Sequence, residues 1–241
     1  MPKFPFIGYH GIRRFKQGRY YIRQSVEYRD GCLTILAGAM RKFDVGVSSY
    51  SFMSTHYHVA AHDLDFTIEV SRVGAFFQFL SSTLSKWLNH MRDTTGHIAC
   101  PDMPFKPIGI LDVESELRTD LYVELNPVTA GVVEHPRELN GLTSFREMLL
   151  EPLVIRRPEG WFDPKKWPEE SQIQLSVPPR ARAAGYSRKT WYLKTVALQE
   201  TLRARIVAER KAAGKRTRSL EWARRQTPET TGESIVDHRR V

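Results

Sequence analysis

The chain has 241 residues, and its 41% hydrophobic content is enough for a packed core, which excludes global disorder. Its 36 Lys and Arg against 27 Asp and Glu give a net charge of +9, which favours a polyanionic partner. Two cysteines exclude a disulfide framework or a zinc ribbon and favour a cytoplasmic setting, and no run reaches the roughly 18 apolar residues of a membrane helix.

The first half of the chain alternates between strand-like and helix-like patterns. Residues 19–26 are rich in Tyr, Ile and Val and predict a first strand. Leu33, Leu36, Met40 and Phe43 recur at spacings of three and four, which predicts an amphipathic helix. Residues 45–53 then predict a second strand, 54–55 a tight turn, and 56–62 the returning strand.

Three more elements complete the predicted domain. An apolar stripe predicts a helix over 71–92, and residues 107–113 predict a fourth strand. A third helix is expected to start near Asp112 or Glu114 and to run past Asn126, where Pro127 should disrupt it. This order predicts an α+β fold, a ferredoxin-like βαββαβ sandwich with helices against one face of an antiparallel sheet, over residues 1–150.

The composition changes after residue 150. Six prolines in 151–180 predict a Pro-rich linker in which regular structure is short. Residues 181–241 form a predicted basic extension, since 180–225 hold 14 Lys and Arg against 3 Glu. Ser187 is expected to cap a helix that runs to about Lys211, and 226–241 are expected to be disordered.

The basic helix has two interpretations. Trp191, Leu198, Leu202 and Ile206 lie on roughly one face, so the helix could simply be solvated and docked by this stripe. The alternative, which we favour from the charge, is a phosphate-binding arm. Its candidate DNA-binding residues are Arg188, Lys189, Lys194, Arg203, Arg205, Arg210 and Lys211.

The pair His56 and His58 is the most informative feature of the first half. Side chains alternate along a strand, so these imidazoles point to one face while Tyr57 points to the other. Two adjacent imidazoles can chelate one metal ion, although histidines on a half-buried strand can also merely pack and hydrogen-bond. His62 shares the parity, but we expect it to end the strand.

Tyr122 and Asn126 form a second candidate pair. They are four residues apart, so they lie on one helical face about a turn from each other. This geometry suits a nucleophile and a neighbouring metal ligand. A Tyr hydroxyl is mostly protonated at neutral pH and attacks poorly unaided. Alone, the pair also fits a core tyrosine and an Asn-Pro helix stop.

Both pairs together resemble a known family. The run from Tyr50 to Val59, which holds the two histidines, and the run from Leu121 to Val133, which holds Tyr122 and Asn126, resemble the REP-associated tyrosine transposases. These belong to the single-tyrosine transposases that carry a His-hydrophobic-His motif. The resemblance covers about residues 8–150.

The resemblance implies a reaction and a cofactor. Tyr122 would attack a phosphodiester in single-stranded or hairpin DNA, leaving a 5′-phosphotyrosine and a free 3′-hydroxyl. A 3′-hydroxyl could then reverse the step and join strands without ATP. His56, His58 and the Asn126 amide oxygen would hold Mg²⁺ or Mn²⁺. The implied protein is a metal-dependent DNA endonuclease and strand transferase, associated with the bacterial nucleoid.

Two rival functions remain open. One is a domesticated DNA-binding protein of the same fold that no longer cuts, and the other is a metal-dependent hydrolase of small phosphoesters that uses only the two histidines. Neither needs a tyrosine at position 122, so the Tyr122 and Asn126 pair favours the transposase. The sequence leaves monomer and homodimer both open.

Overall fold

The computed structural model describes residues 6–98, 107–218 and 225. The predicted disorder of 226–241 lies outside these residues. The first half contains β1 (Gly8–Arg14), the 3₁₀ turn η1 (Lys16–Gly18), α1 (Val26–Phe43), β2 (Val45–Phe52), β3 (His56–Asp63), α2 (Val73–Met91), β4 (Ile108–Ile110) and α3 (Val113–Thr129). The second half contains the 3₁₀ turns η2 (Pro136–Leu139) and η3 (Arg146–Leu149), then β5 (Leu153–Arg156), β6 (Glu170–Ile173), α4 (Pro179–Ala183) and α5 (Arg188–Ala212).

The main sheet confirms the predicted ferredoxin-like order. Its four strands lie in the order β2-β3-β1-β4, and every neighbouring pair is antiparallel. The β2–β3 hairpin is the predicted one, closed by a bond from the Met53 N–H to the His56 carbonyl. The three predicted helices are present as α1, α2 and α3.

The first strand was predicted in the wrong place. β1 is Gly8–Arg14, whereas 19–26 is largely irregular and leads into α1. Tyr20 and Ile22 are buried there without belonging to a strand, so their apolar character reflects burial rather than extended pairing. β1 itself pairs on both sides and its first four residues are buried, which removes the alternation that would have revealed it.

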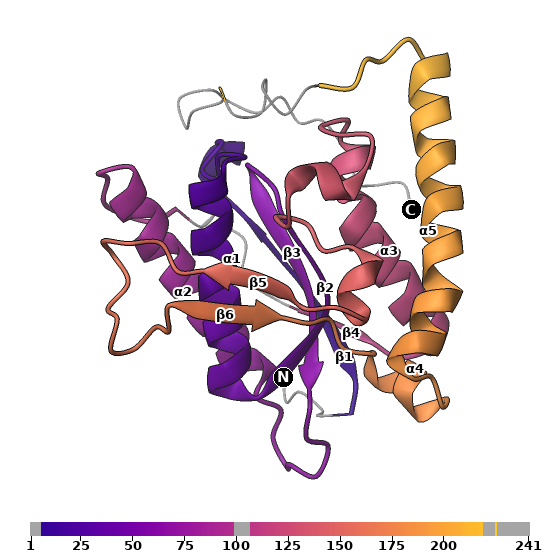
Figure 1. Cartoon of the computed structure of the whole chain (residues 1–241), viewed down its shortest axis with the longest axis horizontal. Helices are drawn as coiled ribbons and strands as arrows, with labels where there is room; N and C mark the ends of the chain where they lie inside the picture. The colour runs from indigo at the N-terminus through magenta and orange to yellow at the C-terminus, as the bar shows by residue number, and fades with distance from the viewer. Residues whose placement is uncertain (1–5, 99–106, 219–224, 226–241) are drawn as a thin grey trace.

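Helices cover both faces of the sheet, so the prediction of one covered face was wrong (Figure 1). Tyr57 of β3 points to α2, where its hydroxyl lies 2.6 Å from that of Ser81. His58, one residue on, points to α3 and contacts Asn126. All eight residues of β2 are buried, and a strand enclosed in this way needs a layer on each side. The same arrangement confirms the predicted parity of His56 and His58.

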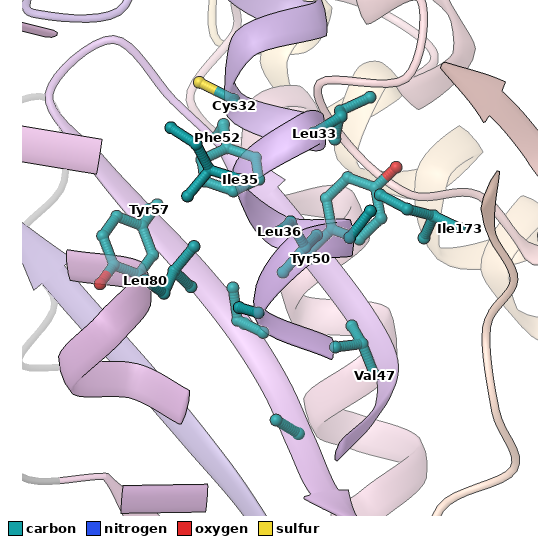
Figure 2. Packing of buried hydrophobic residues seen from close by; sticks show 14 of the residues in the cluster. Cys32, Leu33, Ile35, Leu36, Val47, Tyr50, Phe52, Tyr57, Leu80 and Ile173 are labelled. Atoms are coloured by element: carbon teal, nitrogen blue, oxygen red, sulfur yellow. The ribbon is translucent and has the colours of Figure 1, made fainter. Parts of the chain in front are cut away.

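A β-bulge in β2 changes which face of the sheet its side chains point to. The register shifts between Val47 and Ser49, so the consecutive residues Ser48 and Ser49 both point to α3. After the shift, Tyr50 and Phe52 return to the apolar side. Figure 2 shows this core between the sheet, α1, α2 and β6; the labelled residues are Cys32, Leu33, Ile35, Leu36, Val47, Tyr50, Phe52, Tyr57, Leu80 and Ile173.

Residues 151–180 pack into the fold rather than acting only as the predicted linker. Their regular structure is short, as predicted, because β5 and β6 have four residues each. However, Ile155, Phe162 and Ile173 are buried in the same apolar cluster as α1 and α2. The six prolines limit strand length, but they do not prevent the intervening apolar side chains from packing.

α3 and α5 lie side by side, on the face of the sheet opposite to α1 and α2 (Figure 1). The Asp112 carboxylate caps α3, and the helix continues two residues beyond Pro127 to Thr129, so the predicted disruption was wrong. Proline removes its own N–H bond and crowds the carbonyl four residues before it, but its fixed φ suits the short helical turn that remains. Ser187 caps α5 as predicted, through the Thr190 N–H at 3.2 Å.

Among the described residues, no helix is long and apolar enough to cross a membrane.

Candidate active site

β3 presents His56 and His58 side by side toward α3. Their ring centroids are 4.8 Å apart at an interplanar angle of 80°. His58 is only 2% exposed, whereas His56, at the strand end, is half-buried and its Nδ1 lies 2.9 Å from the Thr55 hydroxyl. The pair therefore has one enclosed and one more open imidazole.

α3 brings Tyr122 and Asn126 to the same place. The Asn126 amide nitrogen lies 3.5 Å from Nε2 of His58, and the edge of the Tyr122 ring meets His58 with centroids 5.5 Å apart. The Tyr122 hydroxyl also hydrogen-bonds the Asn126 side chain. All four residues predicted for the site are thus brought together by two elements more than 60 residues apart in the chain.

Tyr122 is the accessible member of the group, with 38% of its surface exposed. Partial burial raises the pKa of its phenol above the usual value, and the charge of Arg14 and the hydrogen bond with Asn126 oppose that rise. The hydroxyl is therefore protonated at neutral pH, and it needs activation before it can attack.

His10 is a site residue that the sequence prediction missed. It lies on β1 with Nε2 3.1 Å from Nδ1 of His58, and the two rings stack with centroids 5.3 Å apart. Its ring also meets the edge of Tyr122 at 6.0 Å. Burial lowers the pKa of His10 to about 4, so the imidazole is neutral at neutral pH. A strand predicted over Gly8–Arg14 would have put His10 and Arg14 on one face of the sheet. That signal was missed because the first strand was predicted at 19–26.

The donor set at the site fits a divalent cation. Two ligands held at right angles about 2.1 Å from an ion are about 3 Å apart, close to the separation of His58 Nε2 and the Asn126 amide. The amide oxygen and nitrogen exchange places by rotation of the side chain. Within 6–98 and 107–218, no three His, Cys, Asp or Glu side chains form a metal-holding group. Any ion would therefore need Asn126 beside the two histidines.

The predicted DNA-binding residues of α5 fall into two groups. Arg203 bonds Glu200 and the Glu134 carbonyl, Arg210 bonds the Thr129 carbonyl at the end of α3, and Lys211 pairs with Glu134. These three are engaged within the protein. Arg188, Lys189, Lys194 and Arg205 are exposed, and Arg205 pairs with the equally exposed Glu209. Their contact with DNA remains a prediction.

The docking face of α5 differs from the predicted apolar stripe. Trp191 is buried as expected, and Leu202 and Ile206 pack against the core. Leu198 is 38% exposed, and the polar neighbour Gln199 is buried in its place. Gln199 reaches a buried carboxylate of α3, so a polar contact decides which side of α5 faces inward.

The comparisons with known proteins give distant results. No family model and no curated protein matches the chain. Among solved structures, the chain is similar to a REP-associated tyrosine transposase bound to a REP hairpin, with a TM-score of 0.47 and 12% identity over 63% of this chain and 83% of that chain. A function for this protein therefore depends on the side chains of the site itself.

Proposed function

We propose that this protein is a metal-dependent single-tyrosine DNA nickase and strand transferase. The observation that carries the proposal is the convergence of Tyr122 and Asn126 from α3 with His56 and His58 from β3. Neither pair alone distinguishes a site from ordinary packing. Their meeting places an accessible phenol beside a nitrogen and oxygen donor set, which is the combination that phosphodiester attack by tyrosine requires.

In the proposed reaction, the Tyr122 phenolic oxygen bonds to the phosphorus of a DNA phosphodiester, and the bond to the 3′-oxygen breaks. The phenolic proton passes to solvent, and the leaving 3′-oxygen takes up a proton. The products are a 5′-phosphotyrosine and a 3′-hydroxyl, and attack by a 3′-hydroxyl on the phosphotyrosine rejoins DNA. His56, His58 and Asn126 would hold Mg²⁺ or Mn²⁺, which when bound supplies positive charge for the phosphate oxygens.

Neighbouring residues support this assignment by holding the site in place. The Asn126 side chain lies within hydrogen-bonding reach of the Tyr122 hydroxyl and lowers its pKa. The His10 Nε2 can accept a hydrogen bond from the Nδ1–H of His58, which would leave Nε2 of His58 with its lone pair free to bind a metal.

The test is a covalent adduct. The full chain is incubated with single-stranded hairpin DNA labelled at its 3′ end and with Mn²⁺, and the products are separated on a denaturing gel. We expect a labelled protein band that is absent without metal. Retarded DNA in a native gel without any adduct would instead support the non-cleaving DNA-binding protein. Release of phosphate from small phosphoesters would support the hydrolase.

A further inference from the structure

The strand that carries His10 also carries an arginine next to the proposed nucleophile. Arg14 pairs with His56 in the β1–β3 register, and residues paired across neighbouring strands share a face. Arg14 therefore lies on the side of the sheet that holds His56, His58 and Tyr122. Its side chain is exposed. Its charge also lowers the pKa of the Tyr122 phenol against the effect of burial, which agrees with the shared face in placing the guanidinium near that side chain.

Arg14 has no partner of opposite charge among the described residues. Within the residues that the structure describes, its side chain makes neither a hydrogen bond nor an ion pair. The nearby helix offers no competing carboxylate, because Glu116, Asp120 and Glu124 are buried on another face of α3. Glu114, which is exposed, already pairs with Arg118. The fold thus holds a permanent cation, with its bidentate fork, beside the nucleophile and leaves it unpaired.

The surface beyond Arg14 continues the positive charge. Lys16, two residues on, stands at the rim of an open hollow of about 750 Å³ between η1 and the end of α2. Arg19, Arg23 and Arg92 also line this hollow, and Asp93 is the one carboxylate among its lining residues. The hollow adds further positive charge next to the end of β1 that carries Arg14, which is the kind of surface that binds the backbone of a single DNA strand.

We infer that Arg14 binds the scissile phosphate of the DNA strand and stabilises the negative charge that develops on its oxygens during attack by Tyr122. This role deepens the proposed function and rests on it. Two of the guanidinium nitrogens can donate to the two non-bridging oxygens, which stabilises the negative charge that develops on them.

Two measurements on Arg14→Ala test the inference. The first is the salt dependence of binding to a thymidine oligonucleotide of about ten residues, followed by fluorescence anisotropy without metal, so that no cleavage is needed. Loss of one phosphate contact should lower the log–log slope by about 0.7. Arg41→Ala, which removes an exposed arginine of α1 behind the opposite face of the sheet, should leave the slope unchanged.

The second measurement is the rate of adduct formation at saturating hairpin DNA with Mn²⁺. We expect Arg14→Ala to slow it on the order of 100–1,000-fold, the usual cost of one donor to a developing oxyanion, and Arg41→Ala to leave it unchanged. Arg14→Lys should restore the binding slope but only part of the rate, because lysine keeps the charge without the fork. Circular dichroism spectra and melting temperatures that match the wild type would show that all variants are folded.

The outcomes separate this inference from the proposed function. An unchanged slope in Arg14→Ala overturns the phosphate contact, whether or not the wild type forms an adduct. A lowered slope with an unchanged rate at saturation places Arg14 on another phosphate and overturns the scissile assignment. Absence of any adduct in the wild type refutes the proposed function, and with it the rate claim, while the slope still shows whether Arg14 contacts a phosphate.

Discussion

Polar residues lie on two faces of α3, and they are buried and hydrogen-bonded on one face but partly exposed on the other. On one face, Glu116, Asp120 and Glu124 are at most 1% exposed. The Glu116 carboxylate accepts the N–H groups of Arg180 and Ala181 at 2.8 Å each, and Asp120 accepts the Ser48 and Ser49 hydroxyls at 2.7 and 2.9 Å. On the other face, Tyr122 is partly exposed, and the same side of the sheet carries Arg14, which forms no ion pair within the described part of the chain.

The centre of the buried face is an ion network. Arg146, which has no exposed surface, donates to both Glu124 and Asp120 and to the Ser48 carbonyl at 3.1 Å. Ser144 and Gln199 also donate to Glu124, at 2.8 and 2.5 Å. Buried charge that is fully paired in this way is structural, because every group already has its partner. Polar groups left open on the other face of the same helix are candidates for a ligand.

The largest expected effect concerns the open face. Tyr122→Phe removes the nucleophilic oxygen and keeps the ring, so adduct formation should fall below detection while the melting temperature and DNA binding stay close to the wild-type values. A denaturing gel and anisotropy measure the two properties. An adduct formed by the Phe variant would show that another residue is the nucleophile.

On the buried face, the expected effect is on stability. Arg146→Met leaves Asp120 and Glu124 buried without their cation, which should lower the free energy of unfolding by about 3–5 kcal/mol. Urea unfolding followed by circular dichroism measures it. Arg205→Met, which breaks an exposed pair with Glu209, is the matched control and should change stability by less than about 1 kcal/mol. Equal effects of the two substitutions would contradict the structural role of the network.

Two histidines of β3, His58 and His62, are expected to differ in their effect on metal binding. His58→Ala should weaken Mn²⁺ binding on the order of 100-fold or more, since even outer-shell partners of metal ligands contribute 10–100-fold. His62 shares the face but lies near the far end of β3, with Nε2 3.1 Å from the Ser176 hydroxyl. His62→Gln should therefore leave Mn²⁺ affinity unchanged. Calorimetric titration distinguishes them, and equal affinities in both variants would remove the metal site.

The smallest expected effect is a pH dependence at His62. Burial, aided by the charge of Arg182, lowers the pKa of His62 to about 3. The unfolded chain takes up a proton below about pH 6.5 and the folded chain does not, so this residue costs stability as the pH falls from 6.5 towards 3. The stability difference between about pH 7 and about pH 5 should be about 2 kcal/mol smaller in His62→Gln than in the wild type.

That comparison is made by urea unfolding at both pH values. A wild type and a variant with parallel pH profiles would show that the folded protein protonates His62 normally.

The sequence predicted what local periodicity encodes. The period-2 pattern gave the β2–β3 hairpin and the shared side of His56 and His58, and the spacing of four placed Tyr122 with Asn126. These features depend on residues within one element. The meeting of the two pairs came from a family resemblance and not from periodicity, because their contact spans 68 residues.

What the sequence could not predict depends on distant packing. β1 is buried on both sides and lacks alternation, so His10 and Arg14 were not assigned to the site. Gln199 faces inward because its amide donates to the buried Glu124, which also pairs with Arg146, and Leu198 faces solvent. The spacing of apolar residues along α5 does not predict this orientation. For the same reason, deletion of 181–241 should expose α3 and destabilise the fold.

The contact between Gln199 and Glu124 also has a consequence for synthesis. The two residues are 75 positions apart, so at about 5–20 residues per second the ribosome makes Gln199 roughly 4 to 15 seconds after Glu124. Arg146 follows Glu124 by only 22 positions and can neutralise it early. During synthesis, α3 therefore gains its neutralising Arg146 before it is covered by α5. The nascent chain holds an uncovered α3 until α5 has been made.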